Sequence, residues 1–153
     1  MADPLTYTVR WRVRQYELDS NGHVNNAVYL NYAEQLTAEH AQACGYGRQW
    51  TQSKGGGWVI HRHEVTYHAP ALFGDELELT VNVLLVKGVR GVRQTLIRRM
   101  ADLADVAEVL TEWVWVLQGD GRPGRVPQEL VDLAAEVTSR TLAKPPRRLR
   151  PIV

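Results

Sequence analysis

The chain has 153 residues, of which 44% are hydrophobic and 23% charged, a balance typical of a single globular domain and not of a disordered or fibrous chain. Its 18 Lys and Arg against 17 Asp and Glu give a formal charge of +1, which argues against nucleic acid as a partner. With no apolar run of about eighteen residues, no signal sequence and a single cysteine, Cys44, we expect a cytoplasmic protein without a membrane anchor.

The first predicted elements are a strand, a loop and a helix. Hydrophobic and polar residues alternate strictly over Thr6–Arg14, which predicts a half-buried strand. The segment Gln15–Asn25 is rich in residues that favour turns and predicts a loop. Apolar residues then recur at helical spacing over Ala27–Cys44, which predicts one long helix whose first turn is capped by Asn25 or Asn26.

Strand patterns dominate the second half of the chain. Four segments alternate and are bounded by turn residues, namely Trp58–His68, Glu76–Val86, Val92–Met100 and Val106–Leu117. Pro127–Val137 predicts a short surface helix, whereas no periodicity assigns a structure to Arg48–Gly57.

The order of these elements predicts the fold class. One strand, one long helix and four strands at hairpin spacing indicate an α+β fold with an antiparallel sheet of about five strands and the helix on its concave face. We expect a single domain over residues 1–140 and a basic, flexible tail over residues 141–153. Because such a sheet has exposed edges, we also expect self-association.

Two local patterns, a group of glycines and a pair of histidines, could suggest ligand sites but are not specific for them. Gly119, Gly121 and Gly124 match a dinucleotide-binding motif, but too little chain follows for the rest of such a domain, so we assign a turn. Strict alternation would place His61 and His63 on the same face of a strand, as a pair of metal ligands would be. Since a third ligand is missing, we predict no metal site and assign the two histidines to a polar cleft or a subunit contact.

The loop before the helix carries the pattern that is richest in chemistry. Asp19 and His23 precede a helix N-terminus, where unpaired N–H groups and a partial positive charge can polarise a carbonyl oxygen. A carboxylate beside such a group is a minimal site for acyl transfer. The alternative is that Asp19 only bonds the backbone of its own turn, and spacing alone favours that alternative.

A longer segment around this loop resembles a known family. Residues 16–40, YELDSNGHVNNAVYLNYAEQLTAEH, are similar to the signature of the hotdog-fold acyl-CoA thioesterases of the 4-hydroxybenzoyl-CoA thioesterase type. The similarity extends more weakly through residues 65–75 to the strand with Trp113 and Trp115. It implies a curved antiparallel sheet wrapped around one central helix, two subunits paired into a continuous sheet, and active sites at the subunit contact.

The resemblance also implies roles for individual residues. Asp19 matches the catalytic aspartate, as nucleophile or general base, the backbone N–H near Asn26 matches the group that polarises the thioester carbonyl, and His23 with Asn25 orders the loop. The expected substrate is an acyl thioester of coenzyme A or acyl carrier protein, with no cofactor and no metal, in a homodimer or homotetramer. The residues that we expect to contact substrate are Asn25, Tyr29, Trp58, His61 and His63, with Trp11, Tyr32 and Trp113 as further candidates for an acyl channel.

Two other functions stay open at this point. An enoyl-CoA hydratase or dehydratase on a related hotdog scaffold has a similar short loop, although residues 19–23, DSNGH, lack its proline and carry the histidine one residue early. A non-catalytic protein that binds acyl thioesters would use the same pocket without turnover.

Overall fold

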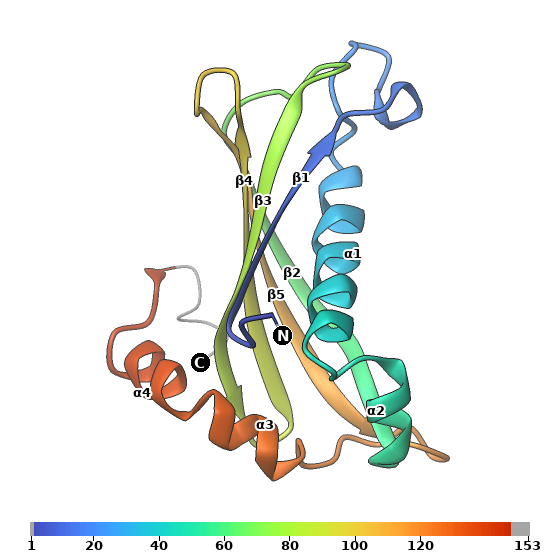
Figure 1. Ribbon diagram of the computed structural model, residues 1–153, viewed down its shortest axis with the longest axis vertical. Helices are drawn as coiled ribbons and strands as arrows, with labels where there is room; N and C mark the ends of the chain where they lie inside the picture. The colour runs from blue at the N-terminus through green and yellow to red at the C-terminus, as the bar shows by residue number, and fades with distance from the viewer. Residues whose placement is uncertain (1, 148–153) are drawn as a thin grey trace.

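The structure, a computed structural model, describes residues 2–147 and is built on one antiparallel sheet with the strand order β1-β3-β4-β5-β2 (Figure 1). The five strands are β1 (Thr6–Arg12), β2 (Gly56–Tyr67), β3 (Glu76–Lys87), β4 (Arg90–Arg99) and β5 (Asp105–Leu117). The helices are the 3-10 turn η1 (Gln15–Glu17), α1 (Val28–Ala43), α2 (Arg48–Ser53), α3 (Gln128–Leu133) and α4 (Ala135–Ala143). The predicted α+β class with five antiparallel strands is confirmed.

Strand β3 shows why the alternating segments form this sheet. Leu77, Leu79 and Val81 are fully buried, while the intervening Glu78 and Thr80 stay half-buried on the other face. The strand pairs with β1 on one side and with β4 on the other. The apolar face produced by this alternation is the one that α1 covers.

Helix α1 has 16 residues and lies along one face of the sheet, in contact with β1, β3 and β5 (Figure 1). It occupies the segment for which a helix was predicted, while α2, α3 and α4 are shorter. Its buried side chains recur every three or four residues, which makes one apolar side, and they are Tyr29, Tyr32, Ala33, Leu36 and His40. This packing fixes the direction of the helix along the sheet.

The C-terminal helices differ from the prediction. Instead of one helix over Pro127–Val137, the chain forms α3 and then α4, which begins at Ala135. Pairing of β1 with β3 reaches only Asn82, and α4 covers the strand edge beyond it, where the N–H of Val86 donates to Thr138 Oγ1 at 3.0 Å.

The predicted domain boundary at residue 140 therefore falls inside α4, because Thr141 is buried as part of the helix. Of the predicted tail, residues 148–153 lie outside the described residues.

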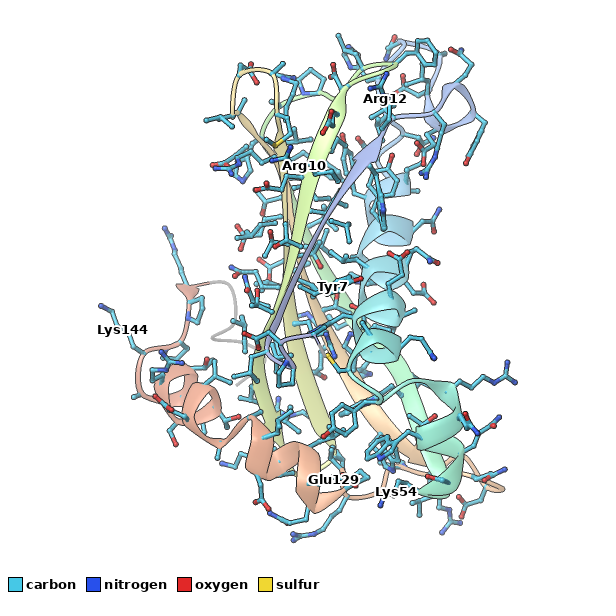
Figure 2. The ribbon with its side chains drawn as sticks, viewed as in Figure 1. Tyr7, Arg10, Arg12, Lys54, Glu129 and Lys144 are labelled. Carbon is cyan, nitrogen blue, oxygen red and sulfur yellow. The ribbon has the colours of Figure 1, made fainter. Side chains whose placement is uncertain are left out.

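The two ends of the molecule carry different features. The loop between β1 and α1 lies at one end, and α2 and α3 lie at the other (Figure 1). At this second end Lys54, after α2, and Glu129, in α3, form an exposed ion pair of 3.0 Å (Figure 2). No helix within residues 2–147 combines the length and apolar character needed to cross a bilayer.

Replacement of a side chain between α1 and the sheet tests this packing. Leu36 is fully buried in the main core, so Leu36→Ala should lower the free energy of unfolding by about 2–5 kcal/mol through lost burial and the cavity left behind. The matched control is Gln35→Ala on the exposed side of the same helix, which should change it by less than about 0.5 kcal/mol. Urea denaturation measures both, and equal effects would contradict the packing described.

Candidate active site

The loop between β1 and α1 is held in place by backbone pairing. Leu18 and Val24 form an isolated antiparallel bridge within the loop, and His23 forms another with Leu72. The N–H of Val24 also donates to the carbonyl of Ala71 at 2.8 Å. The loop is therefore fixed against the turn that connects β2 to β3.

Asp19 lies within this pinned loop and is half-buried. Its Oδ1 accepts hydrogen bonds from the N–H of Asn21 at 2.8 Å and of His23 at 3.1 Å. Its Oδ2 makes no hydrogen bond to the rest of the described chain. The charge of Asp19 also contributes, after burial, to the raised pKa of Tyr29. Oδ1 therefore bonds the backbone of its own turn, as the alternative interpretation of Asp19 expected. Oδ2 is left without a hydrogen-bond partner in the described chain.

His23 supports the loop through its backbone. Its carbonyl accepts the N–H of Asp19 at 2.7 Å, and its own N–H donates to the Asp19 carboxylate. The imidazole is exposed.

The start of α1 differs in one detail from the predicted cap. The N-cap residue is Ala27, which offers no side-chain hydrogen bond, and not Asn25 or Asn26. Asn25 Oδ1 instead accepts from the N–H of Ala27 at 2.9 Å, two residues further on, because this side chain closes a turn before the helix begins. The Tyr67 hydroxyl donates to the carbonyl of Asn26 at 2.8 Å. Within the described chain the N–H of Asn26 has no hydrogen-bond partner.

Tyr29 is a buried side chain in the first turn of α1, next to this loop. It is 2% exposed, and its ring meets those of Tyr32 and Tyr67 edge-on, with centroids 6.1 and 5.7 Å apart. Burial raises its pKa to about 12, so the hydroxyl stays protonated at neutral pH. The structure therefore gathers Asp19, Asn25, Asn26 and Tyr29 at the N-terminal end of α1.

A buried carboxylate that the sequence patterns did not single out supports the same loop. Glu17 is 6% exposed and accepts hydrogen bonds from the N–H of Arg14 at 2.8 Å and from the Tyr32 hydroxyl at 2.7 Å. The guanidinium of Arg14 adds an ion pair at 3.3 Å. Burial and the Glu17 carboxylate both raise the pKa of Tyr32, which keeps its hydroxyl a donor. The helical position of Tyr32 on the buried side of α1 was the signal that could have found this contact.

The predicted pairing of His61 and His63 on one face is wrong. The register of β2 against β5 shifts between Ile60 and Arg62, and this irregularity reverses the alternation expected of a regular strand. His61 lies 3.8 Å from the Glu112 carboxylate, whereas His63 bonds Thr111 at 2.9 Å. Thr111 and Glu112 are consecutive on β5 and point to opposite faces, so the two histidines do as well.

Burial lowers the pKa of His63 on the inner face, which keeps it neutral at neutral pH. In residues 2–147 no group of three or more His, Cys, Asp or Glu side chains is arranged to hold a metal ion.

Trp58 lies elsewhere, in the wall of a cavity of about 590 Å³ near the C-terminal end of α1. Trp113, another predicted channel residue, lines the same cavity. Gly91 makes room for Trp58, since a Cβ atom on it would lie 3.1 Å from the indole ring. His40, at this end, is twelve residues beyond Val28, which at the rise of an α-helix is roughly 18 Å along α1. Within one chain the structure does not bring Trp58 next to Asp19.

Comparisons with known proteins identify relatives of this chain. The family model described as the thioesterase-like superfamily matches residues 13–134. The chain is 28% identical over 124 residues to the acyl-acyl carrier protein thioesterase ATL2, chloroplastic, of Arabidopsis thaliana, over 81% of this chain but only 65% of that protein. It is also 28% identical over 129 residues to the acyl-CoA thioester hydrolase YbgC of Escherichia coli O157:H7, over 82% of this chain and 95% of that protein.

A solved structure gives the corresponding result for the fold. The crystal structure of Slr0204, a 1,4-dihydroxy-2-naphthoyl-CoA thioesterase from Synechocystis, aligns with a TM-score of 0.76 at 17% identity, over 86% of this chain and 96% of that one. These comparisons confirm the resemblance to hotdog-fold thioesterases.

The hydrogen bond between Tyr32 and Glu17 provides a test of how the loop is held. Tyr32→Phe removes a donor to a buried carboxylate and should lower the free energy of unfolding by about 1.5–3 kcal/mol. Tyr16→Phe, in the same loop but 82% exposed, should leave it unchanged. Chemical denaturation of both variants makes the comparison, and an unchanged Tyr32→Phe variant would show that the contact does not hold the loop.

Proposed function

Since this chain belongs to the thioesterase-like superfamily, we propose that it hydrolyses acyl thioesters of coenzyme A or acyl carrier protein to a free acid and a thiol. The observation that carries the proposal is the carboxylate of Asp19, half-buried, with one oxygen held by the loop and the other uncommitted. The curated relatives named above act on both kinds of thioester, so the carrier stays open.

The electrophilic side of the proposed site is the start of α1. The N–H of Asn26 is without a partner in the described chain, and the Asn26 carbonyl is anchored by Tyr67. The N-terminal end of a helix also carries a partial positive charge. A thioester carbonyl oxygen placed there would accept a hydrogen bond that strengthens as negative charge develops on it, which lowers the barrier to attack.

The chemistry can follow two routes from this arrangement. Asp19 Oδ2 attacks the thioester carbonyl and expels the thiolate, and water then hydrolyses the resulting anhydride. In the other route Asp19 takes a proton from a water molecule, which attacks the carbonyl directly and gives the acid and the thiol in one sequence. Asn25 and the backbone of His23 order the loop in both, and Tyr29 contributes an apolar floor.

The edge strand β2 supports the proposal of a homodimer. It is 12 residues long, contains neither proline nor lysine, and has one side unpaired within the described chain. Exposed Val59 and Tyr67 lie along it. A long edge of this kind is a template for pairing, and a two-fold axis normal to the sheet would join two copies of β2 antiparallel. The two sheets would then be continuous and enclose each α1.

Such a dimer would complete the active site. Antiparallel pairing places the Gly56 end of one β2 beside the Tyr67 end of the other. The cavity with Trp58 lies at the first end, and Tyr67 touches Asn26 at the second. We therefore expect Asp19 of one protomer to face the acyl cavity of its partner, with His63 near the middle of the contact. His61 points to the other face of the sheet and is not part of this site.

Replacement of Asp19 by asparagine tests the chemistry. The amide oxygen of Asp19→Asn can still accept from Asn21 and His23, so the fold should be kept while the charge is lost. We expect kcat for acyl-CoA hydrolysis, followed by thiol release, to fall by roughly 10²- to 10⁴-fold with KM nearly unchanged. Asp120→Asn is the matched control, since Asp120 likewise accepts the N–H of the residue two positions later, Arg122, but lies in an exposed turn away from the proposed site. Comparable turnover in Asp19→Asn would refute the assignment.

Mixed dimers test whether the site is shared between protomers. Ala41→Trp should fill the cavity from α1 and block long acyl chains, whereas Ala43→Trp on the exposed side of the helix should not. A heterodimer of Asp19→Asn and Ala41→Trp chains has one intact site if the site is shared, and none if each site lies within one chain. Co-expression with two tags should therefore restore about half of the activity of the unmodified dimer. No recovery, or a monomer in sedimentation equilibrium, would contradict the shared site.

A further inference from the structure

Arg93 on β4 is a half-buried cation without an ion-pair partner in residues 2–147. Its side chain is half-buried and lines the cavity at the C-terminal end of α1. Its one hydrogen bond within the described chain runs from Nη1 to Nδ1 of His40, at 2.8 Å. No carboxylate in residues 2–147 forms an ion pair with it.

The side chain that Arg93 contacts is neutral, and the charge of Asp3 also acts on that side chain. His40 Nε2 lies 2.7 Å from the Asp3 carbonyl and donates to it, so Nδ1 is the unprotonated nitrogen that accepts from Arg93. Burial and the nearby Arg93 charge lower the pKa of His40, although its hydrogen bond to the Asp3 carbonyl and the charge of the Asp3 carboxylate oppose this. Burial likewise raises the pKa of the Cys44 thiol, which points at the same carbonyl. The ring of Tyr7, labelled in Figure 2, stacks on His40 at 5.3 Å and fixes its plane.

The positive charge of Arg93, which has no anionic partner in residues 2–147, is unfavourable for the stability of the folded protein. Burial lowers the pKa of Arg93 to about 10, so the guanidinium is still protonated at neutral pH. Arginine is seldom buried unless an anion accompanies it, because its lost hydration must be replaced. The exposed Arg98, on the same strand, has such a partner in Glu78 at 2.8 Å.

The cavity around Arg93 is otherwise suited to an apolar chain. Trp58, Val92 and Trp113 form part of its wall, and its volume lies in the range of small-molecule sites. The indole N–H of Trp113 is buried without an acceptor among the described residues. Glu34 and Arg48 also line the cavity, but both are exposed, and neither pairs with Arg93.

We propose that this cavity binds an apolar chain that ends in a carboxylate, and that Arg93 is the residue that receives the carboxylate. The ligand chemistry fits two sources, a free fatty acid or an acyl thioester whose chain carries a second carboxylate at its far end. The bond itself is a charge-assisted pair, which the planar guanidinium can make with two parallel N–H donors. Binding at Arg93 requires no hydrolysis, so the inference goes beyond the proposed function.

Calorimetric titration of the full-length protein tests the site. Decanoate and 1-decanol have the same chain length and differ in the charged end, so decanoate should bind at least tenfold more tightly, with one site per chain. Arg93→Met should remove this preference, Arg93→Lys should retain part of it, and Arg98→Met, on the same strand, should leave it intact. Circular dichroism and the unfolding midpoint establish that each variant is folded. If Arg93→Met does not fold, the preference for decanoate is measured in Arg93→Lys instead. A partial loss of the preference supports the proposal, and an unchanged preference contradicts it.

Three results would overturn the proposal. They are equal binding of decanoate and 1-decanol, a preference for decanoate that survives in Arg93→Met, and no binding of either compound to the unmodified protein.

Kinetics then separates the two sources of the carboxylate. If the far end of a substrate is recognised, kcat/KM for decanedioyl-CoA should exceed that for decanoyl-CoA at least tenfold in the unmodified protein but not in Arg93→Met. If a free fatty acid is the ligand, the two substrates should be equivalent and decanoate should inhibit through Arg93. Retained decanoate binding without any hydrolysis would contradict the proposed function and leave this inference standing. Hydrolysis without an Arg93-dependent preference for the carboxylate would do the reverse.

Discussion

Burial of one side of α1 against the sheet is the constraint on which the placement of the proposed site depends. Tyr29, Tyr32 and Leu36 are almost completely withdrawn from water on this side, and burial of each such side chain contributes roughly 1.5–3 kcal/mol. A helix held along its length in this way cannot slide or turn without exposing these residues. Its first turn is therefore fixed beside the loop with Asp19, and its last turn beside the cavity with Arg93.

Two charged side chains that hydrogen-bond residues of α1, Glu17 and Arg93, have different surroundings. Glu17 is satisfied by the N–H and guanidinium of Arg14 and by the hydroxyl of Tyr32, so its charge stabilises the loop without any ligand. Arg93 has only the neutral imidazole of His40 as its acceptor. A charge that the protein satisfies by itself indicates a structural role, whereas one that it leaves open toward a cavity indicates binding. This contrast is why Glu17 is assigned to the scaffold and Arg93 to a ligand.

Much of the fold follows from sequence periodicity, and the failures have physical reasons. Strand β3 matches its predicted segment because its hydrophobic residues alternate regularly from Leu77 to Val83. The faces of His61 and His63 were mispredicted because an irregularity in backbone pairing leaves no mark in that alternation. The loop with Asp19 was identifiable from its turn residues and the helix that follows. The isolation of Arg93 was not, because it depends on which carboxylates are absent nearby, and that is a property of the folded chain.

The opposite charges of Asp19 and Arg93, at the two ends of the proposed shared site, would orient a bound ligand. Asp19 is negative and Arg93 is positive, and an apolar cavity wall with Trp58 and Trp113 lies next to Arg93. A chain with a carboxylate at one end is repelled by Asp19 and attracted by Arg93, so it enters with its thioester toward Asp19. Hydrolysis at the proposed site would then create a new carboxylate beside Asp19. The repulsion between these two groups would favour release of the product. A product with a single carboxylate would have to turn around to be held at Arg93, whereas the product of a dicarboxylic chain would keep its far carboxylate there.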